Sequence, residues 1–254
     1  MTSEAPPALA IEGLAVCYGH TTALADVALA IRQHEILGLM GRSSAGKSTL
    51  LKAALMLLAP HAGSVRVLGE PHGAPGPRSR IAYLPQRFRP PGHLLGHDYV
   101  RLTLAFYGRQ AKRPQTAILA ERLDLDPAVL DRPIRCYAKG MVQKLGLLAM
   151  LLADLPLLVL DEPLSGLHPG ARRIAKRRLL DYRARGRAIL LSSSIPSDHD
   201  KLCDRVAILH RGRLRYLGSP ADLEARHDAP TLASAFLAEI ERADGAGRGA
   251  AVRA

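Results

Sequence analysis

The chain has 254 residues, of which 48% are hydrophobic, enough for one large domain or for a domain with an inserted subdomain. Lys and Arg number 35 against 23 Asp and Glu, and the formal charge of +12 favours anionic partners such as nucleotides, nucleic acids or acidic lipids without choosing among them. The three cysteines, Cys17, Cys136 and Cys203, lie far apart in the sequence, which excludes a disulfide framework and a CxxC zinc site.

Membrane and targeting segments are not expected. The first residues, MTSEAPPALA, lack the basic region and long apolar run of a signal peptide. The longest apolar stretch, LGLLAMLLADLPLLVL, is interrupted by Asp154 and Pro156, so it is too short and too polar to span a bilayer. These features predict a soluble, cytoplasmic chain.

Strand and helix patterns alternate along the chain. Apolar or alternating stretches predict strands within 8–19, 26–41, 63–71, 80–86, 155–163, 187–194 and 204–220. Helical patterns cover 48–60, closed by Pro60, and 171–186, and a mainly helical texture from about 88 to 150 indicates an inserted subdomain. This alternation predicts an α/β fold with a mostly parallel sheet, followed by an irregular, small and polar tail at 243–254.

A phosphate-binding loop is the most specific motif. The stretch GRSSAGKST fits G-x-x-x-x-G-K-[ST], follows a predicted strand and opens a predicted helix. Its glycines allow a tight turn whose amides point inward, and the positive end of the following helix completes an anion site. The predicted nucleotide-binding residues are Gly41, Arg42, Ser43, Ser44, Ala45, Gly46, Lys47, Ser48 and Thr49. Lys47 reaches the β- and γ-phosphates, and the Ser48 hydroxyl is a ligand for Mg²⁺.

Two carboxylates follow the apolar strand LLVL, where ligands bind at the carboxyl edge of open α/β sheets. Asp161 is predicted to hold Mg²⁺ through a water, and Glu162 to polarise the water that attacks the γ-phosphate. Together with the phosphate loop, this pair predicts MgATP as the ligand.

These residues resemble one family closely, the nucleotide-binding subunits of ATP-binding cassette (ABC) transporters, over roughly residues 8–220. CYGHTTAL is similar to the segment whose aromatic residue, here Tyr18, stacks on adenine. YLPQ is similar to the loop whose glutamine, here Gln86, contacts Mg²⁺ and the attacking water and senses the permease. YAKGMVQKL occupies the place of the family signature in the form found beside type-2 exporter permeases, and LCDRVAILHRGRL is similar to the closing strand pair of the same group.

The resemblance implies a P-loop NTPase fold with a mostly parallel core sheet, an antiparallel β region near the N-terminus and an inserted helical subdomain. The expected parts are 1–87 and 151–220 for the ATP-binding core, 88–150 for the helical subdomain with the signature, and 221–254 for a C-terminal helix and tail. The resemblance also implies catalytic roles for Glu162, Gln86 and Lys47.

The expected partners are a transmembrane permease, which places the chain at the inner face of the cell membrane, and a second ATP-binding subunit in a homodimer or heterodimer. In the head-to-tail pair, the signature residues Lys139, Gly140 and Met141 contact the γ-phosphate bound by the opposite subunit.

Three positions depart from the family pattern. Ala138 lacks the signature serine hydroxyl, His168 replaces an aspartate that crosses the dimer interface, and Ser194 replaces the switch histidine that contacts the γ-phosphate. Losing one transition-state donor costs about 10²–10³ in rate. Either the subunit binds ATP but hydrolyses it slowly, or Glu162 together with a rearranged His168 or a lysine is sufficient for hydrolysis.

Weaker signals leave other interpretations open. The basic helix at 171–187 fits contact with nucleic acid or acidic lipid, and equally a solvated amphipathic helix. His93 and His97 have the i,i+4 spacing of a possible metal site, although they fit equally well as histidines of a loop that bind no metal. The rival functions are a soluble cassette ATPase acting on nucleic acid or the ribosome, and a non-hydrolysing partner in a mixed pair.

Overall fold

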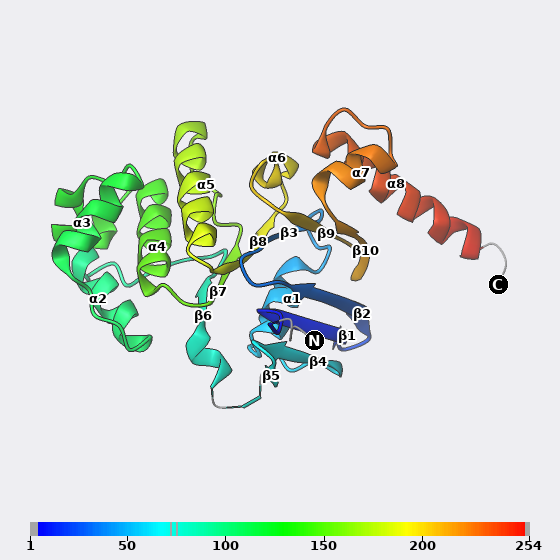
Figure 1. Cartoon of the computed structure of the whole chain (residues 1–254), viewed down its shortest axis with the longest axis horizontal. Coiled ribbons are helices and arrows are strands. Elements are labelled where there is room, and N and C mark those ends of the chain that lie inside the picture. The colour runs from blue at the N-terminus through cyan, green and yellow to red at the C-terminus, as the bar shows by residue number, and fades with distance from the viewer. Residues whose placement is uncertain (1–4, 72, 75, 252–254) are drawn as a thin grey trace. The chain divides into compact units, whose positions relative to one another are not determined.

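The computed structural model describes residues 5–71, 73, 74 and 76–251, with side chains as far as Gly245. The chain divides into two compact units, one formed by Met1–Arg78 and Leu190–Ala254 and the other by Ser79–Ile189. The second unit is therefore an insertion in the sequence of the first (Figure 1).

The first unit contains a four-stranded antiparallel sheet with the order β2-β1-β4-β5. Its strands are β1 (Leu9–Tyr18), β2 (Thr21–Ile31), β4 (Ala62–Val67) and β5 (Glu70–Pro71). Along β1, Ile11, Leu14 and Val16 are buried, whereas Glu12 between them is exposed. One face of this sheet therefore packs on the core and the other meets solvent.

The same unit holds a run of neighbouring strands in the order β10-β9-β3-β8. They are β3 (Ile36–Met40), β8 (Ala188–Ser193), β9 (Arg205–His210) and β10 (Arg213–Gly218), and β8 carries the chain across the boundary between the units. β3 pairs in parallel with β9, whereas β10 is antiparallel to β9. Every residue of β3 is buried, as expected for a strand covered on both faces.

The helices of the first unit are α1 (Lys47–Ala54), α6 (Pro196–His199), α7 (Pro220–Arg226) and α8 (Leu232–Ala251). α1 ends well before Pro60, where the sequence pattern placed its end, because Met56 reverses the chain with a φ of 52°. α8 continues to Ala251 through part of the segment predicted as an irregular tail, and residues 252–254 of that segment lie outside the described residues.

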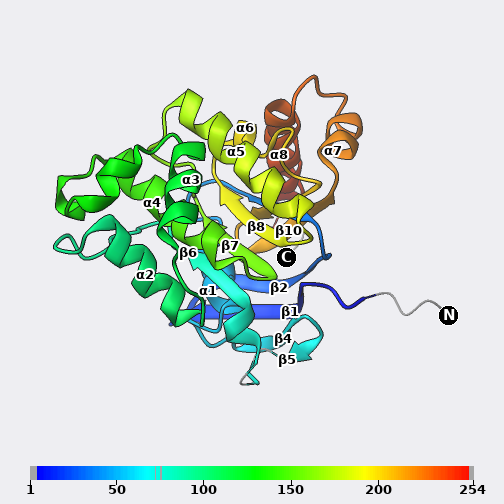
Figure 2. The ribbon, with the colours of Figure 1, turned by 60° about the vertical axis from the view of Figure 1, so that its left-hand side comes forward.

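The second unit contains β6 (Ile81–Leu84), which pairs in parallel with β7 (Leu157–Asp161). Its helices are α2 (Gly96–Phe106), α3 (Arg113–Arg122), α4 (Lys139–Ala153) and α5 (Pro169–Ala184). Short 3₁₀ turns occupy Pro77–Arg80 at the unit boundary, Pro127–Asp131 and Ile134–Cys136. α2 and α3 both pack against α4, forming a helical layer that Figure 2 shows from a second direction.

The predicted α/β class is confirmed. Parallel pairs (β3 with β9, β6 with β7) combine with an antiparallel sheet near the N-terminus, and the helices α2 to α4 are inserted between β6 and β7. In the described part of the chain, no helix combines the length and the apolar character that crossing a bilayer requires.

Candidate nucleotide-binding site

The predicted phosphate loop leaves the buried strand β3 and turns directly into α1. Within it, Ser44 has a φ of 64° and Gly46, the residue before the helix, has a φ of 105°. The amide of Ala45 donates to the carbonyl of Arg42 over 3.1 Å, which closes the turn. The loop is therefore a tight turn with left-handed residues, the backbone form in which successive amides face one concavity.

Both motif glycines are required by close backbone approach. A Cβ on Gly41 would lie 2.6 Å from the carbonyl oxygen of Leu209, and one on Gly46 would lie 2.9 Å from the carbonyl oxygen of Ala23. Neither neighbour is a flexible side-chain end, so the loop itself would have to move. Because these two glycines have no side chain, the loop can contact the backbone behind it directly.

Gly41→Ala is expected to lower the free energy of unfolding by about 1–3 kcal/mol, as overpacking does in well-packed interiors. Urea denaturation measures this loss. The matched control is Gly73→Ala, because a Cβ at exposed Gly73 meets nothing within 4 Å. Equal stability of the Gly41→Ala protein and its control would contradict the close approach.

The concave side of the loop carries the charge that an anion needs. Lys47 is 8% exposed, and its Nζ donates to the carbonyls of Gly41 at 2.6 Å and Arg42 at 3.3 Å. The first helical hydrogen bond of α1 runs from Leu50 to Gly46, and no side chain caps the helix. The amides of Ser48 and Thr49 therefore precede the first helical bond and belong to the positive end of the helix, which attracts phosphate.

The other predicted residues of the first unit lie at strand ends. Tyr18 is the last residue of β1 and its side chain is 51% exposed, which leaves the ring accessible for stacking. Ser194 is exposed and directly follows β8, the neighbour of β3.

The turn after Ser194 is held by buried polar groups. The Ser193 hydroxyl donates to Asp198 at 2.8 Å and accepts from the Ile195 amide at 3.1 Å. His199 is fully buried, 3.6 Å from the Cys203 sulfur and close against Gly38. His199 therefore does not take the place of the switch histidine.

In the second unit, the acidic pair lies at the end of β7. Asp161 is 2% exposed, and Glu162 turns the chain with a φ of 51°. Burial, together with the nearby Asp161 carboxylate, raises the pKa of Tyr83 on β6 to about 12. Leu84 is in register with Leu160, so the two parallel strands end together and Gln86 follows at the same edge as the acidic pair.

Gln86 and the signature residue Lys139 share one groove of about 660 Å³. Its other walls come from the loop after β6, from Ile134 to Tyr137 and from the first turns of α4. Arg87, Arg89 and Arg135 make this groove basic.

The signature forms the start of α4. Ala138 is the residue before the helix, its carbonyl accepts from Met141 and Val142, and no side chain caps the helix end. A serine would supply a capping hydroxyl at this position, which alanine cannot. Lys139 is exposed and Gly140 is half-buried, so the positive end of α4 remains open to an anion.

His168 has a structural role that the sequence did not predict. Its Nδ1 accepts from the Ala171 amide at 3.3 Å and so caps α5, and its Nε2 lies 4.0 Å from Asp124. Asp124 also binds Lys144 of α4 at 2.7 Å, and this hydrogen bond holds the pKa of the Asp124 carboxyl below its usual range. The imidazole at this position therefore caps its own helix while its side chain stays 67% exposed.

The predicted site residues divide between the two units. The first unit carries Tyr18, the loop Gly41–Thr49 and Ser194, and the second carries Gln86, Lys139–Met141, Asp161 and Glu162. Within each unit the residues lie at strand ends or helix starts. Sequence reasoning missed the turn at Leu209–Gly212 that supports the loop and the Lys144–Asp124–His168 contacts.

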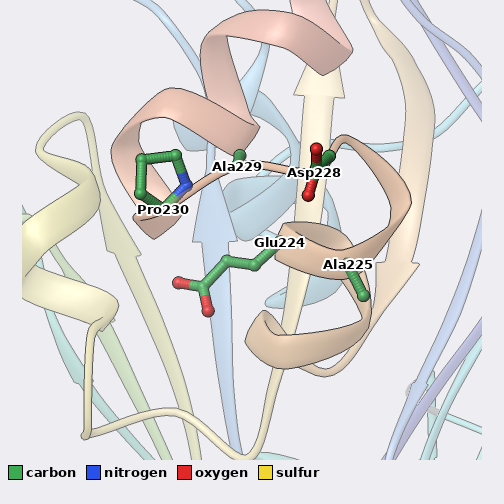
Figure 3. Close-up of a pocket in the computed structure, with 5 residues that line it drawn as sticks. All are labelled: Glu224, Ala225, Asp228, Ala229 and Pro230. Atoms are coloured by element: carbon green, nitrogen blue, oxygen red, sulfur yellow. The ribbon is translucent and has the colours of Figure 1, made fainter.

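Two other arrangements offer acidic or histidine side chains. A shallow pocket of about 280 Å³ is lined by α7 and the loop that follows it, where Glu224 and Asp228 supply the charge (Figure 3). His97 lies on α2, where its Nε2 is 3.9 Å from Asp131. Across residues 5–71, 73, 74 and 76–251, no group of three or more His, Cys, Asp or Glu is arranged to hold a metal ion.

Comparisons with known proteins agree with this geometry. The family model described as ABC transporter matches residues 24–165. An uncharacterised ABC transporter ATP-binding protein of Nostoc sp. is 36% identical over 204 residues, which cover 79% of this chain and 61% of that protein. The Nod factor export ATP-binding protein I of Ralstonia nicotianae is 32% identical over 226 residues, covering 85% of this chain and 68% of that protein.

A solved structure described as the ATP-binding subunit of an ABC transporter superposes with a TM-score of 0.84 at 27% identity, covering 91% of this chain and 98% of that one. The chain spans about three fifths of the length of the Nostoc relative (61%). None of these similarities supports the nucleic-acid alternative. The chain belongs to the ABC transporter family, and its fold is that of the family's ATP-binding subunits.

Proposed function

We propose that the chain binds MgATP, pairs head to tail with a second ATP-binding subunit and drives a separate permease in export, while hydrolysing ATP slowly. The name of the Ralstonia relative, an export ATP-binding protein, supports the direction of transport. The chain would then lie at the inner face of the cell membrane, held there by the permease.

The observation that carries this proposal is the phosphate loop. A tight turn joins a fully buried strand to an uncapped helix end, and the Lys47 ammonium lies over the loop carbonyls at 2.6 and 3.3 Å. A triphosphate offers this ammonium better partners than neutral carbonyls, because its anionic oxygens add charge–charge attraction to the hydrogen bond.

The available donors fit magnesium. The Ser48 hydroxyl, the Asp161 carboxylate and the Gln86 side-chain carbonyl are hard oxygen ligands of the kind that Mg²⁺ prefers, and few protein ligands suffice beside phosphate oxygens. Bound by these residues, magnesium would neutralise the charge that develops on the phosphates. Glu162 accepts a proton from the attacking water, and Lys47 stabilises the phosphate charge.

The signature end of α4 supplies the contact across the dimer. Its open helix start directs the amides of Lys139, Gly140 and Met141 to an anion. At Ala138, His168 and Ser194 the chain lacks the signature serine, the aspartate that crosses the dimer interface and the switch histidine. We therefore infer that ATP closes the pair but is hydrolysed slowly. Binding energy drives closure, because ATP contacts both subunits only in the closed state.

Exposed apolar residues of the helical layer support a permease contact. On α2, Phe106 is 83% exposed and Leu102 is 48% exposed, although the helix buries Val100 and Leu104. Large exposed apolar side chains that lie on one helix mark an interaction surface.

Lys47→Ala is expected to weaken MgATP binding by roughly 10- to 150-fold, because it removes a hydrogen-bonding cation worth about 1.5–3 kcal/mol. Isothermal titration calorimetry measures the dissociation constant. Lys52→Ala is the matched control, since Lys52 is an exposed lysine in the last turn of the same helix. Unchanged affinity in the Lys47→Ala protein, or equal losses in both variants, would refute the proposed nucleotide site.

A further inference from the structure

The turn between β9 and β10 supports the phosphate loop from behind. Arg211 and Gly212 form this two-residue turn with φ values of 48° and 72°, the combination of a type I′ hairpin. The Gly212 amide donates to the carbonyl of Ala45 in the phosphate loop at 3.1 Å. The Gly212 carbonyl accepts from the Ala25 amide at 2.8 Å, so the turn is bound on two sides.

The loop has no intervening side chain at this contact. A Cβ on Gly41 would lie 2.6 Å from the Leu209 carbonyl, and the side chain of Leu209 also approaches Gly46. At Gly41, backbone therefore lies on backbone, whereas at Gly46 the turn contributes the Leu209 side chain. A shift of the turn cannot be absorbed by a side-chain rotation and would displace the loop.

A carboxylate of the C-terminal helix α8 holds this turn. Asp244 Oδ1 accepts from His210 Nε2 at 2.9 Å and lies 2.8 Å from Arg211 Nη2. His210 is 7% exposed, so its ring is fixed by packing as well as by the carboxylate. The His210 hydrogen bond and the charges on Arg211 and Arg42 hold the pKa of Asp244 below its usual range.

α8 is itself anchored one turn earlier. Glu239 is fully buried and binds His227 at 2.7 Å and Arg242 at 2.5 Å. These charged hydrogen bonds lower the pKa of Glu239, because they offset the cost of its burial. The register of α8 is thereby fixed where Asp244 reaches the turn.

We propose that Asp244 is a positioning residue for the phosphate loop, acting through His210 and Arg211 so that docking of α8 sets the affinity for nucleotide. This inference rests on the proposed binding of MgATP. Asp244 does not contact the nucleotide. Its carboxylate keeps the β9–β10 turn in the position on which Gly41 and Ala45 lie, with the loop already shaped for phosphate.

The test compares Asp244→Ala and Asp244→Asn with Glu241→Ala, which removes an exposed acid from the same helix. Calorimetric titration with MgATP is expected to show a loss of affinity of roughly 2- to 30-fold for Asp244→Ala, the range for residues that couple to a site without touching ligand. Asp244→Asn keeps the shape of the side chain and covers the case in which the alanine variant folds poorly.

Two further measurements distinguish the positioning role of Asp244 from a purely structural role. Without nucleotide, the melting temperature of Asp244→Ala is expected to match that of Glu241→Ala, within the small differences typical of surface substitutions. His210→Phe, which keeps a ring and loses the donor, is expected to weaken binding, and the double variant Asp244→Ala/His210→Phe is expected to weaken it no further.

Unchanged MgATP affinity in both Asp244 variants, or fully additive losses in the double variant, would overturn the inference. If the wild-type protein itself fails to bind MgATP, the proposed function falls with it. If the wild-type protein binds and the Asp244 variants bind equally well, only the positioning role falls.

Discussion

Replacing Ser194 with histidine is expected to raise ATP turnover by about 10²-fold, the lower end of the range for one transition-state donor. Ser194 is exposed and follows β8 directly, so an imidazole at this position would lie at the protein surface. The turn around it is already fixed by Ser193 and Asp198. Because Ala138 and His168 remain unchanged in this variant, the gain in turnover is expected to stay below about 10³-fold, the upper end of that range. Phosphate release at saturating MgATP measures it.

Ser197→His is the matched control, because it places a histidine at another exposed serine of the same turn. Turnover in that variant is expected to equal that of the wild type. A wild-type rate already within the usual enzyme range of about 1–10³ s⁻¹, with no gain on Ser194→His, would exclude slow hydrolysis as a property of this subunit.

Glu162→Gln is expected to lower the residual turnover by about 10²–10⁴-fold, the usual contribution of a general base. The glutamine keeps the size of the side chain but cannot accept the proton of the attacking water. MgATP affinity is expected to stay within a factor of a few, since Glu162 acts on water and not on the phosphates. Release of labelled phosphate, measured over hours, distinguishes this variant from the wild-type protein, whose own turnover is expected to be slow.

The control for this change is Glu121→Gln, an exposed acid on α3 of the same unit. Equal turnover in the two variants would show that hydrolysis does not depend on Glu162. A loss of MgATP affinity in Glu162→Gln alone would place this carboxylate in binding rather than in proton transfer.

The phosphate loop could be predicted because its chemistry is local. Gly41, Gly46 and Lys47 lie within a few residues, and the strand before them and the helix after them carry their own periodic signals. The class of the fold followed from the alternation of strands and helices, and the structure confirms it. The end of α1 was missed because a left-handed residue, Met56, ends the helix before the proline does.

The roles of His168 and Asp244 could not be predicted because their partners are distant in sequence. His168 caps α5 and lies near Asp124, a contact that depends on how the helical layer folds. Asp244 lies in a stretch of small residues whose composition indicates a tail, yet α8 brings its carboxylate to the turn behind Gly41. Periodicity and motifs carry no signal for such pairings, which follow from tertiary packing.

A crystal structure of the chain with Mg²⁺ and a non-hydrolysable ATP analogue tests the central claim most directly. We predict that the amides from Ser43 to Thr49 surround the β-phosphate and that Lys47 Nζ leaves the carbonyls of Gly41 and Arg42 to bind the β- and γ-phosphates. Magnesium is predicted between the Ser48 hydroxyl and those phosphates. An analogue bound elsewhere, with Lys47 still on its own loop, would contradict the account.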